Sequence, residues 1–155
     1  MKPYITTTLM FFLFASFRNF NPNVQNIVKV GDLKFIISGL TPGHGWVRAV
    51  LYNNSDKFLS QFGFCFADSA LVKEDGTATV VIHNLPYGRY AGTFYQDENQ
   101  NFVIDRNLIG IPTEPYAFTN SIRAKWKIPD YQKVTFNFQQ PSLSQAIVLN
   151  YWSNQ

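Results

Sequence analysis

The sequence predicts an all-β domain, a two-layer sandwich of about seven short antiparallel strands. Aromatic residues make up 17% of the 155 residues and charged residues only 15%, against about 25% in an average globular protein. Aromatic and β-branched residues favour strands. Short alternating segments are separated by turns rich in Gly, Pro and Asn, and no stretch of ten residues has a helical pattern. This length fits one domain.

The first 26 residues are predicted to be a signal peptide and a linker that precede a single domain over 27–155. Lys2 comes before the apolar run 9–17, which is the layout of a secretory leader. The run is shorter than the ~20 apolar residues of a membrane span, so we expect no span in the mature protein. Cleavage is expected between Ala15 and Gln25, and the protein is expected in the periplasm, on the outer surface or secreted. A buried first strand or an uncleaved anchor stays the alternative.

Removal of this leader would leave a nearly neutral domain with one cysteine. Lys2 and Arg18 are two of the 13 basic residues, so 11 remain against 10 acidic residues, a net charge of +1. Nucleic-acid-binding domains carry a basic patch, so we expect no nucleic-acid partner. Cys65 lies between Phe64 and Phe66, which predicts a buried, unreactive thiol and excludes an internal disulfide.

The first two strands are predicted to form a hairpin. Leu33, Phe35 and Ile37 alternate with the residues between them, which predicts a strand within 27–40. A turn that contains Pro and Gly at 41–45 leads into a returning strand at 46–52.

The rest of the chain is predicted to form short strands around one long loop. The spacing of Phe58, Leu59 and Phe62 predicts one or two helical turns within 53–72. Further strands are expected at 77–83, 89–96, 134–138 and 146–152, with a seventh within 107–126. The loop 97–133 is long enough to be functional or to be tied down by side chains or ions. The predicted core residues are Phe35, Ile37, Val50, Val80, Ile82 and Phe136.

Oxygen-bearing side chains in this loop have the spacing of a calcium-binding loop. They stand at positions 1, 3, 5 and 9 of the loop, as Asp97, Asn99, Asn101 and Asp105. Ca²⁺ takes six to eight oxygen ligands at about 2.3–2.6 Å, so Ca²⁺ is the candidate cofactor. Phe102 occupies the position that favours Gly, and Glu114 could add a carboxylate only if the loop folds back. A weak Ca²⁺ site and a turn in which these side chains bond their own backbone both stay open.

Three aromatic residues are the candidate ligand-binding residues: Tyr116, Phe118 and Trp126. Their rings could stack on a sugar, or they could anchor the loop to the core. Arg123, Lys125 and Lys127 alternate with apolar residues in the same loop. This pattern fits a solvated strand edge or a small patch that binds an acidic glycan.

Three segments resemble a bacterial family known as domain of unknown function 2141. They are Gly45-Trp46-Val47-Arg48-Ala49-Val50-Leu51-Tyr52-Asn53, Leu85-Pro86-Tyr87-Gly88-Arg89-Tyr90-Ala91 with the following 97–101, and Ile109-Gly110-Ile111-Pro112-Thr113-Glu114-Pro115-Tyr116-Ala117-Phe118-Thr119-Asn120. The resemblance covers roughly 32–151. It implies an exported protein with an immunoglobulin-like sandwich of the transthyretin-like or carboxypeptidase-regulatory-like type, and it implies no reaction. Gln96, Phe102 and Ala117 replace the family's His, Gly and Gly.

The expected function is binding rather than catalysis. His44 lies in a turn and His83 ends a strand, and neither has a spaced partner for a nucleophile or a metal. We expect an exported, non-catalytic module that binds a cell-surface glycan or another surface component, or a protein, with a cation as a stabiliser. The alternatives are a calcium-dependent carbohydrate-binding module and, less favoured, a small periplasmic hydrolase or accessory enzyme.

Overall fold

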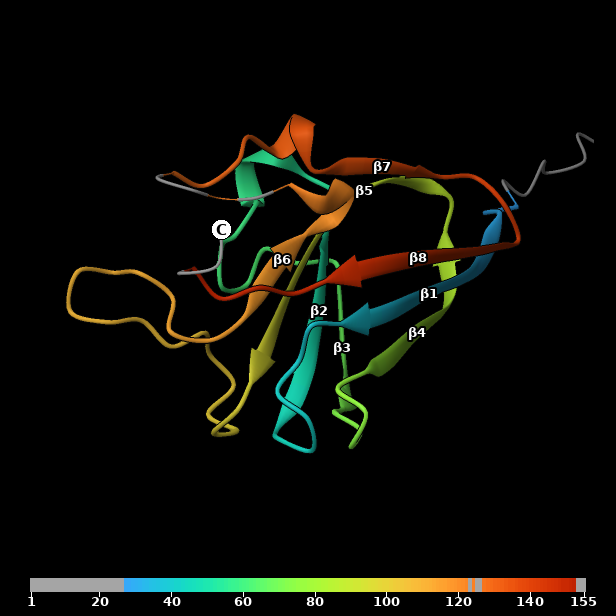
Figure 1. Ribbon diagram of the computed structural model, residues 1–155. Helices are drawn as coiled ribbons and strands as arrows, with labels where there is room; N and C mark the ends of the chain where they lie inside the picture. The colour runs from blue at the N-terminus through green and yellow to red at the C-terminus, as the bar shows by residue number, and fades with distance from the viewer. Residues whose placement is uncertain (1–26, 123, 125–126, 153–155) are drawn as a thin grey trace, which may run out of the picture.

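The computed structural model, which describes residues 27–122, 124 and 127–152, is a sandwich of two β-sheets (Figure 1). The strands are β1 (Val30–Ser38), β2 (Trp46–Tyr52), β3 (Phe66–Leu71), β4 (Ala78–Pro86), β5 (Gly88–Asp97), β6 (Tyr116–Phe118), β7 (Thr135–Phe138) and β8 (Ser142–Val148). Between the strands lie short 3-10 turns, η1 (Ser55–Lys57), η2 (Thr119–Ser121) and η3 (Tyr131–Lys133). The all-β fold class is confirmed, with eight strands rather than about seven.

The smaller sheet has the strand order β4-β1-β8, and the larger sheet has the order β3-β2-β5-β6, with β7 also paired to β5. All of these pairs are antiparallel except β1–β8, which is parallel, so the prediction of a purely antiparallel sandwich is wrong at this pair. The chain leaves β7 at Phe138, beside Gly88, and enters β8 at Ser142, beside Asp32. Because this crossing is short, β8 must start at the end of the sandwich where β1 also starts.

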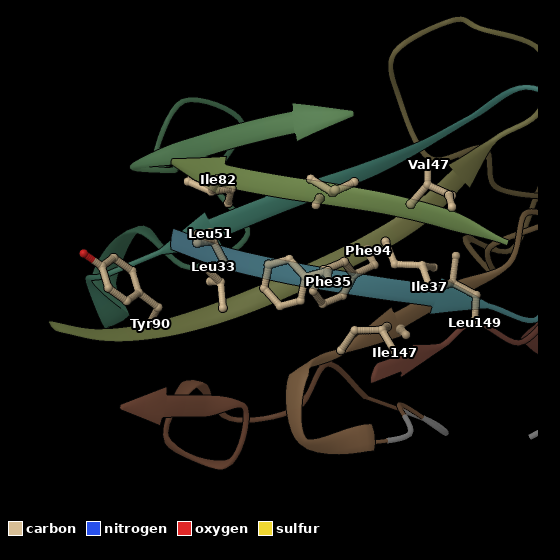
Figure 2. Close-up of a cluster of buried hydrophobic side chains, with 14 of the residues drawn as sticks. Leu33, Phe35, Ile37, Val47, Leu51, Ile82, Tyr90, Phe94, Ile147 and Leu149 are labelled. Atoms are coloured by element: carbon tan, nitrogen blue, oxygen red, sulfur yellow. The ribbon is translucent and has the colours of Figure 1, made fainter. Parts of the chain in front are cut away.

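The main core lies between the two sheets (Figure 2). Phe35 of β1 is fully buried, with its ring centroid 4.7 Å from that of Phe94 and 6.5 Å from that of Phe136. The predicted core residues are confirmed as buried except one: Phe35, Ile37, Val80, Ile82 and Phe136.

Val50 is the exception, and its prediction as a core residue is wrong. In β2 the fully buried residues are Val47, Ala49 and Leu51, which belong to the main core. Successive side chains of a strand point to opposite faces, so Val50 lies on the outer face of the larger sheet.

Two predicted elements differ from the structure. One helical turn does form within 53–72, but as η1 at Ser55–Lys57, just before 58–62, and the chain then forms β3, an unpredicted strand that pairs with the edge of β2. The last strand covers Ser142–Val148 rather than 146–152 because its pairing with β1 begins at Asp32.

The predicted leader and linker at 1–26 lie outside the described residues. Within the described part of the chain, no helix has the length and apolar character needed to cross a bilayer.

Candidate functional site

Two neighbouring features at the larger sheet are candidates for function: the polar loop, residues 97–105, and an apolar groove beside it. The polar loop starts at the end of β5, where Asp97 lies opposite Trp46 of β2. It is followed by a hairpin-like turn, closed by a bridge between Arg106 and Pro112, that extends away from the sandwich (Figure 1). The chain then returns to β6.

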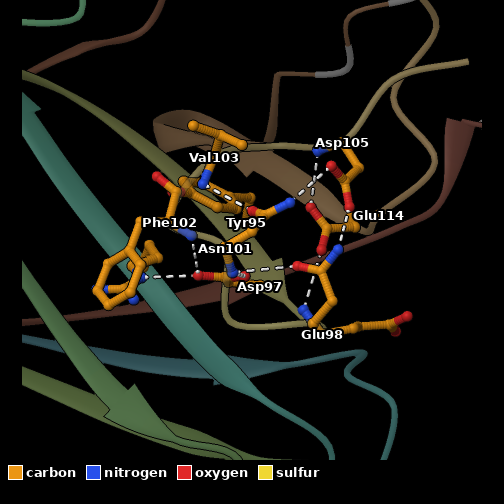
Figure 3. Close-up of polar contacts among 10 residues, drawn as sticks. Tyr95, Asp97, Glu98, Asn101, Phe102, Val103, Asp105 and Glu114 are labelled. Atoms are coloured by element: carbon orange, nitrogen blue, oxygen red, sulfur yellow. Dashed lines mark hydrogen bonds and ion pairs between the residues drawn. The ribbon is translucent and has the colours of Figure 1, made fainter.

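Asp97 is the centre of the polar loop, and it is fully buried (Figure 3). Its Oδ1 accepts a hydrogen bond from the backbone N–H of Asn101 at 3.0 Å. Its Oδ2 accepts from the N–H of Phe102 at 3.0 Å and from Nε of Arg48 at 3.2 Å. A buried carboxylate needs such partners, and these three tie the loop to β2.

The other three predicted cation ligands lie against one another. The side-chain amides of Asn99 and Asn101 donate to the two carboxylate oxygens of Asp105, at 2.6 Å and 2.9 Å. The amide oxygens of Asn99 and Asn101 accept from backbone N–H groups at 3.2 Å and 3.0 Å, as in Asx turns. The structure therefore brings together the four residues of the predicted site, with their oxygens accepting hydrogen bonds. Among the described residues, no group of three or more His, Cys, Asp or Glu side chains could hold a metal.

Glu114 does fold back onto the polar loop. It is 4% exposed, and its carboxylate oxygens accept from the N–H of Glu98 at 3.0 Å and from the N–H of Asp105 at 2.9 Å. Burial raises the pKa of Glu114. This side chain closes the loop at both ends, a role that the sequence left conditional.

Phe102 has a left-handed backbone conformation, with φ at +70°. It stands at the position where a calcium-binding loop favours glycine. This left-handed conformation costs a side-chain-bearing residue about 1–2 kcal/mol. The carbonyl of Phe102 accepts from the hydroxyl of Tyr95 at 3.1 Å, and the Arg48 guanidinium carbon lies 4.0 Å from the Phe102 ring centroid. This cation–π contact offsets part of the cost and fixes the ring at the edge of the groove.

Gln96, another departure from the family pattern, has a structural role. It is fully buried and faces the turn between β1 and β2. Its Nε2 donates to the carbonyls of Thr41 and His44 at 3.1 Å and 2.8 Å, and its Oε1 accepts from the N–H of Thr41 at 2.9 Å.

The groove has a volume of about 1000 Å³ and lies on the outer face of the larger sheet. One row of its floor crosses four strands, as Ala67, Val50, Thr93 and Phe118. The next row contains Arg48, Tyr95 and Tyr116. The residues between these positions point to the opposite face of the sheet and fill the main core. Both faces of the larger sheet therefore carry apolar side chains.

The loops around the sheet form the walls of the groove, as Leu59, Phe64, Phe102, Val103, Ile104, Ile109, Ile111 and Ile128. Sequence reasoning missed the groove because its lining comes from segments far apart in the chain. One signal in the sequence could have indicated it. Residues 102–104 and 108–111 are largely apolar but lack the alternation of a strand, so they had no expected place in the core.

Tyr116 and Phe118 belong to the floor rather than to an exposed platform. Each is 7% exposed and packs in the cluster on the outer face of the sheet. Stacking on a sugar requires an exposed ring face. The burial of these two residues therefore does not support a role in sugar stacking. The third predicted ligand-binding residue, Trp126, lies outside the described residues.

The described residues with catalytic chemistry are dispersed. Cys65 is partly buried, its Sγ donates to the carbonyl of Leu51 at 3.3 Å, and burial raises the pKa of its thiol. His83 pairs through Nδ1 with Asp32 Oδ2 at 3.0 Å, on the exposed surface of the smaller sheet. Neither group lines the groove.

One protein family, described as Uncharacterized protein conserved in bacteria (DUF2141), matches the chain over residues 36–145. The chain belongs to this family. The DUF2141 match runs from within β1 into β8, so it includes the polar loop and the floor of the groove. No curated protein and no solved structure matches the chain.

Proposed function

We propose that this protein is an exported, non-catalytic module that binds a largely apolar ligand in the groove of the larger sheet. The observation that carries the proposal is the groove itself, with its volume of about 1000 Å³ and its apolar floor and walls. Ligand pockets usually have volumes of about 300–1,000 Å³ and a mainly apolar lining with a few polar groups. A small, largely apolar ligand is therefore proposed in place of the glycan or protein partner that was expected from the sequence.

Exposed apolar side chains at the mouth of the groove support this proposal. Five residues of the wall are both apolar and exposed, at 44%, 69%, 52%, 78% and 59%: Phe64, Phe102, Val103, Ile109 and Ile128. Contiguous exposed apolar surface marks interaction sites. A ligand that covers these side chains gains about 25 cal/mol for each Å² of apolar surface removed from water.

Filling the groove is expected to abolish binding of an apolar probe. The neutral fluorophore N-phenyl-1-naphthylamine should bind the wild-type protein saturably, with a rise in fluorescence. Val50→Trp places a large ring in the floor of the groove, between Ala67 and Thr93, and should weaken this binding at least tenfold. Ile36→Trp is the matched control because Ile36 is 45% exposed on the outer face of the smaller sheet. Equal binding by both variants would contradict the proposed site.

Export is supported by the apolar run at 9–17 and the lysine before it. Production of the full chain in a bacterial host is expected to give a processed protein whose first residue lies between Ser16 and Asn26. N-terminal sequencing of the periplasmic fraction measures this. Soluble cytoplasmic protein that keeps Met1 would contradict export.

A Ca²⁺ ion at the polar loop is the second part of the proposal. The hydrogen bonds that hold Asp97, Asn99, Asn101 and Asp105 close together, with Glu114 beside them, support it. Phe102 and Val103 belong both to this loop and to the wall of the groove, so a bound cation would stiffen that wall. A calcium-dependent carbohydrate-binding module is the alternative, and the apolar lining of the groove favours it less.

A further inference from the structure

The charges that line the groove have one sign. Three lining residues are cationic, Arg48, Arg106 and Lys127, and none of the described residues that line it is acidic. The charge of Arg48 is balanced by the buried carboxylate of Asp97. Arg106 donates from Nη1 to the carbonyl of Gly110 at 2.9 Å, which leaves its charge uncompensated. In the described part of the chain, neither Arg106 nor Lys127 forms an ion pair.

We propose that the groove binds an anionic amphiphile, an alkyl chain that ends in a single carboxylate or phosphate group. This inference rests on the proposed function, because it assumes that the groove is the binding site. The apolar floor and walls take the chain, and Arg106 and Lys127 take the head group. A guanidinium offers paired N–H donors to both carboxylate and phosphate. Near apolar walls these charges are less screened than in open solvent, so the sign of the head group affects affinity.

The other ligand classes fit the lining less well. A sugar needs many hydrogen-bonding partners, whereas most side chains of this groove have none to offer. A cationic amphiphile would meet two uncompensated positive charges. A neutral lipid would gain the same apolar contacts and leave the charge of Arg106 and Lys127 unused.

The test is displacement of N-phenyl-1-naphthylamine by ligands that share a sixteen-carbon chain, kept below their micellar concentrations. Palmitate and 1-palmitoyl-lysophosphatidylglycerol are the anionic ligands, and they distinguish a free fatty acid from a lipid phosphate. Hexadecanol is the neutral ligand and hexadecyltrimethylammonium the cationic one. We expect at least one anionic ligand to bind about tenfold more tightly than hexadecanol. Loss of one exposed ion pair typically costs up to about fivefold in affinity, so Arg106→Gln and Lys127→Gln should each weaken the anionic ligand by about two- to fivefold.

Matched variants separate charge from loop structure. Arg106→Lys keeps the charge and should keep most of the preference, and Lys34→Gln removes an exposed cation of the smaller sheet and should change nothing. The preference should shrink at high salt. Equal binding of anionic and neutral ligands, or a preference that survives in the Arg106→Gln/Lys127→Gln double variant, would overturn this inference while the groove keeps its proposed function. Failure of the probe and of all four ligands to bind would instead overturn the proposed function.

Discussion

Replacement of Phe35 by alanine is expected to lower the free energy of unfolding by about 3–5 kcal/mol. Phe35 is fully buried in β1 and contacts Phe94 of β5 and Phe136 of β7, so it joins the smaller sheet to the larger one. Its removal loses the transfer free energy of an aromatic ring and leaves a cavity between two sheets that cannot close up around it. Equilibrium unfolding in urea, followed by tryptophan fluorescence, measures the change.

The adjacent residue supplies the control. Ile36 lies on the same strand but is 45% exposed, so Ile36→Ala should cost less than about 1 kcal/mol. A similar loss in the two variants would mean that β1 does not place its alternate residues on opposite sides of the smaller sheet.

Replacement of Asp97 by alanine is expected to destabilise the protein by about 3 kcal/mol, the second largest effect. The change removes three hydrogen bonds and leaves Arg48 and two backbone N–H groups without their partner. Loss of one member of a buried ion pair typically costs about 3–5 kcal/mol, and partial exposure of the Arg48 side chain, at 19%, places the expectation at the lower end. Asp130→Ala is the control, because its ion pair with Lys133 is exposed and should contribute less than about 1 kcal/mol.

A second variant of Asp97 tests the proposed cation. A Ca²⁺ ion with a Kd near 10⁻⁴ M would stabilise the wild-type protein by about 1.4 kcal/mol at millimolar Ca²⁺, a rise of a few degrees in melting temperature. Asp97→Asn removes the charge and keeps the shape, so this rise should disappear. Melting of the wild-type protein that is indifferent to both Ca²⁺ and chelator would leave the polar loop as a set of Asx turns and contradict the cation.

The sequence predicts the fold well where one face of a strand is apolar and the other is not. In β1, Leu33, Phe35 and Ile37 are buried as predicted, and the residues between them are exposed or only partly buried. In β2 the pattern is ambiguous, since Val50 is as apolar as Val47 but faces the groove. β3 was missed because an edge strand with polar residues such as Asp68 and Ser69 lacks a strong alternation.

The polar loop could be predicted as a cluster because its residues are close in sequence, and the structure does bring Asp97 and Asp105 into one network. The groove could not be predicted in this way. Its floor depends on the register of four strands, which aligns Val50 with Thr93, and its walls depend on loops that pack over them. Only the three-dimensional arrangement shows that Arg106 and Lys127 line the same hollow.

The parallel pairing of β1 with β8 constrains the order in which the domain can assemble. β1 is the central strand of the smaller sheet, and the register joins Asp32 to Ser142, across most of the chain. During synthesis, one edge of β1 therefore stays without its native partner until the residues of β8 have left the ribosome. Contacts this distant in sequence slow folding, because the entropy of closing the loop must be overcome before the contact forms. A chain with this topology stays unfolded for longer, which is compatible with the proposed export if the chain crosses the membrane before it folds.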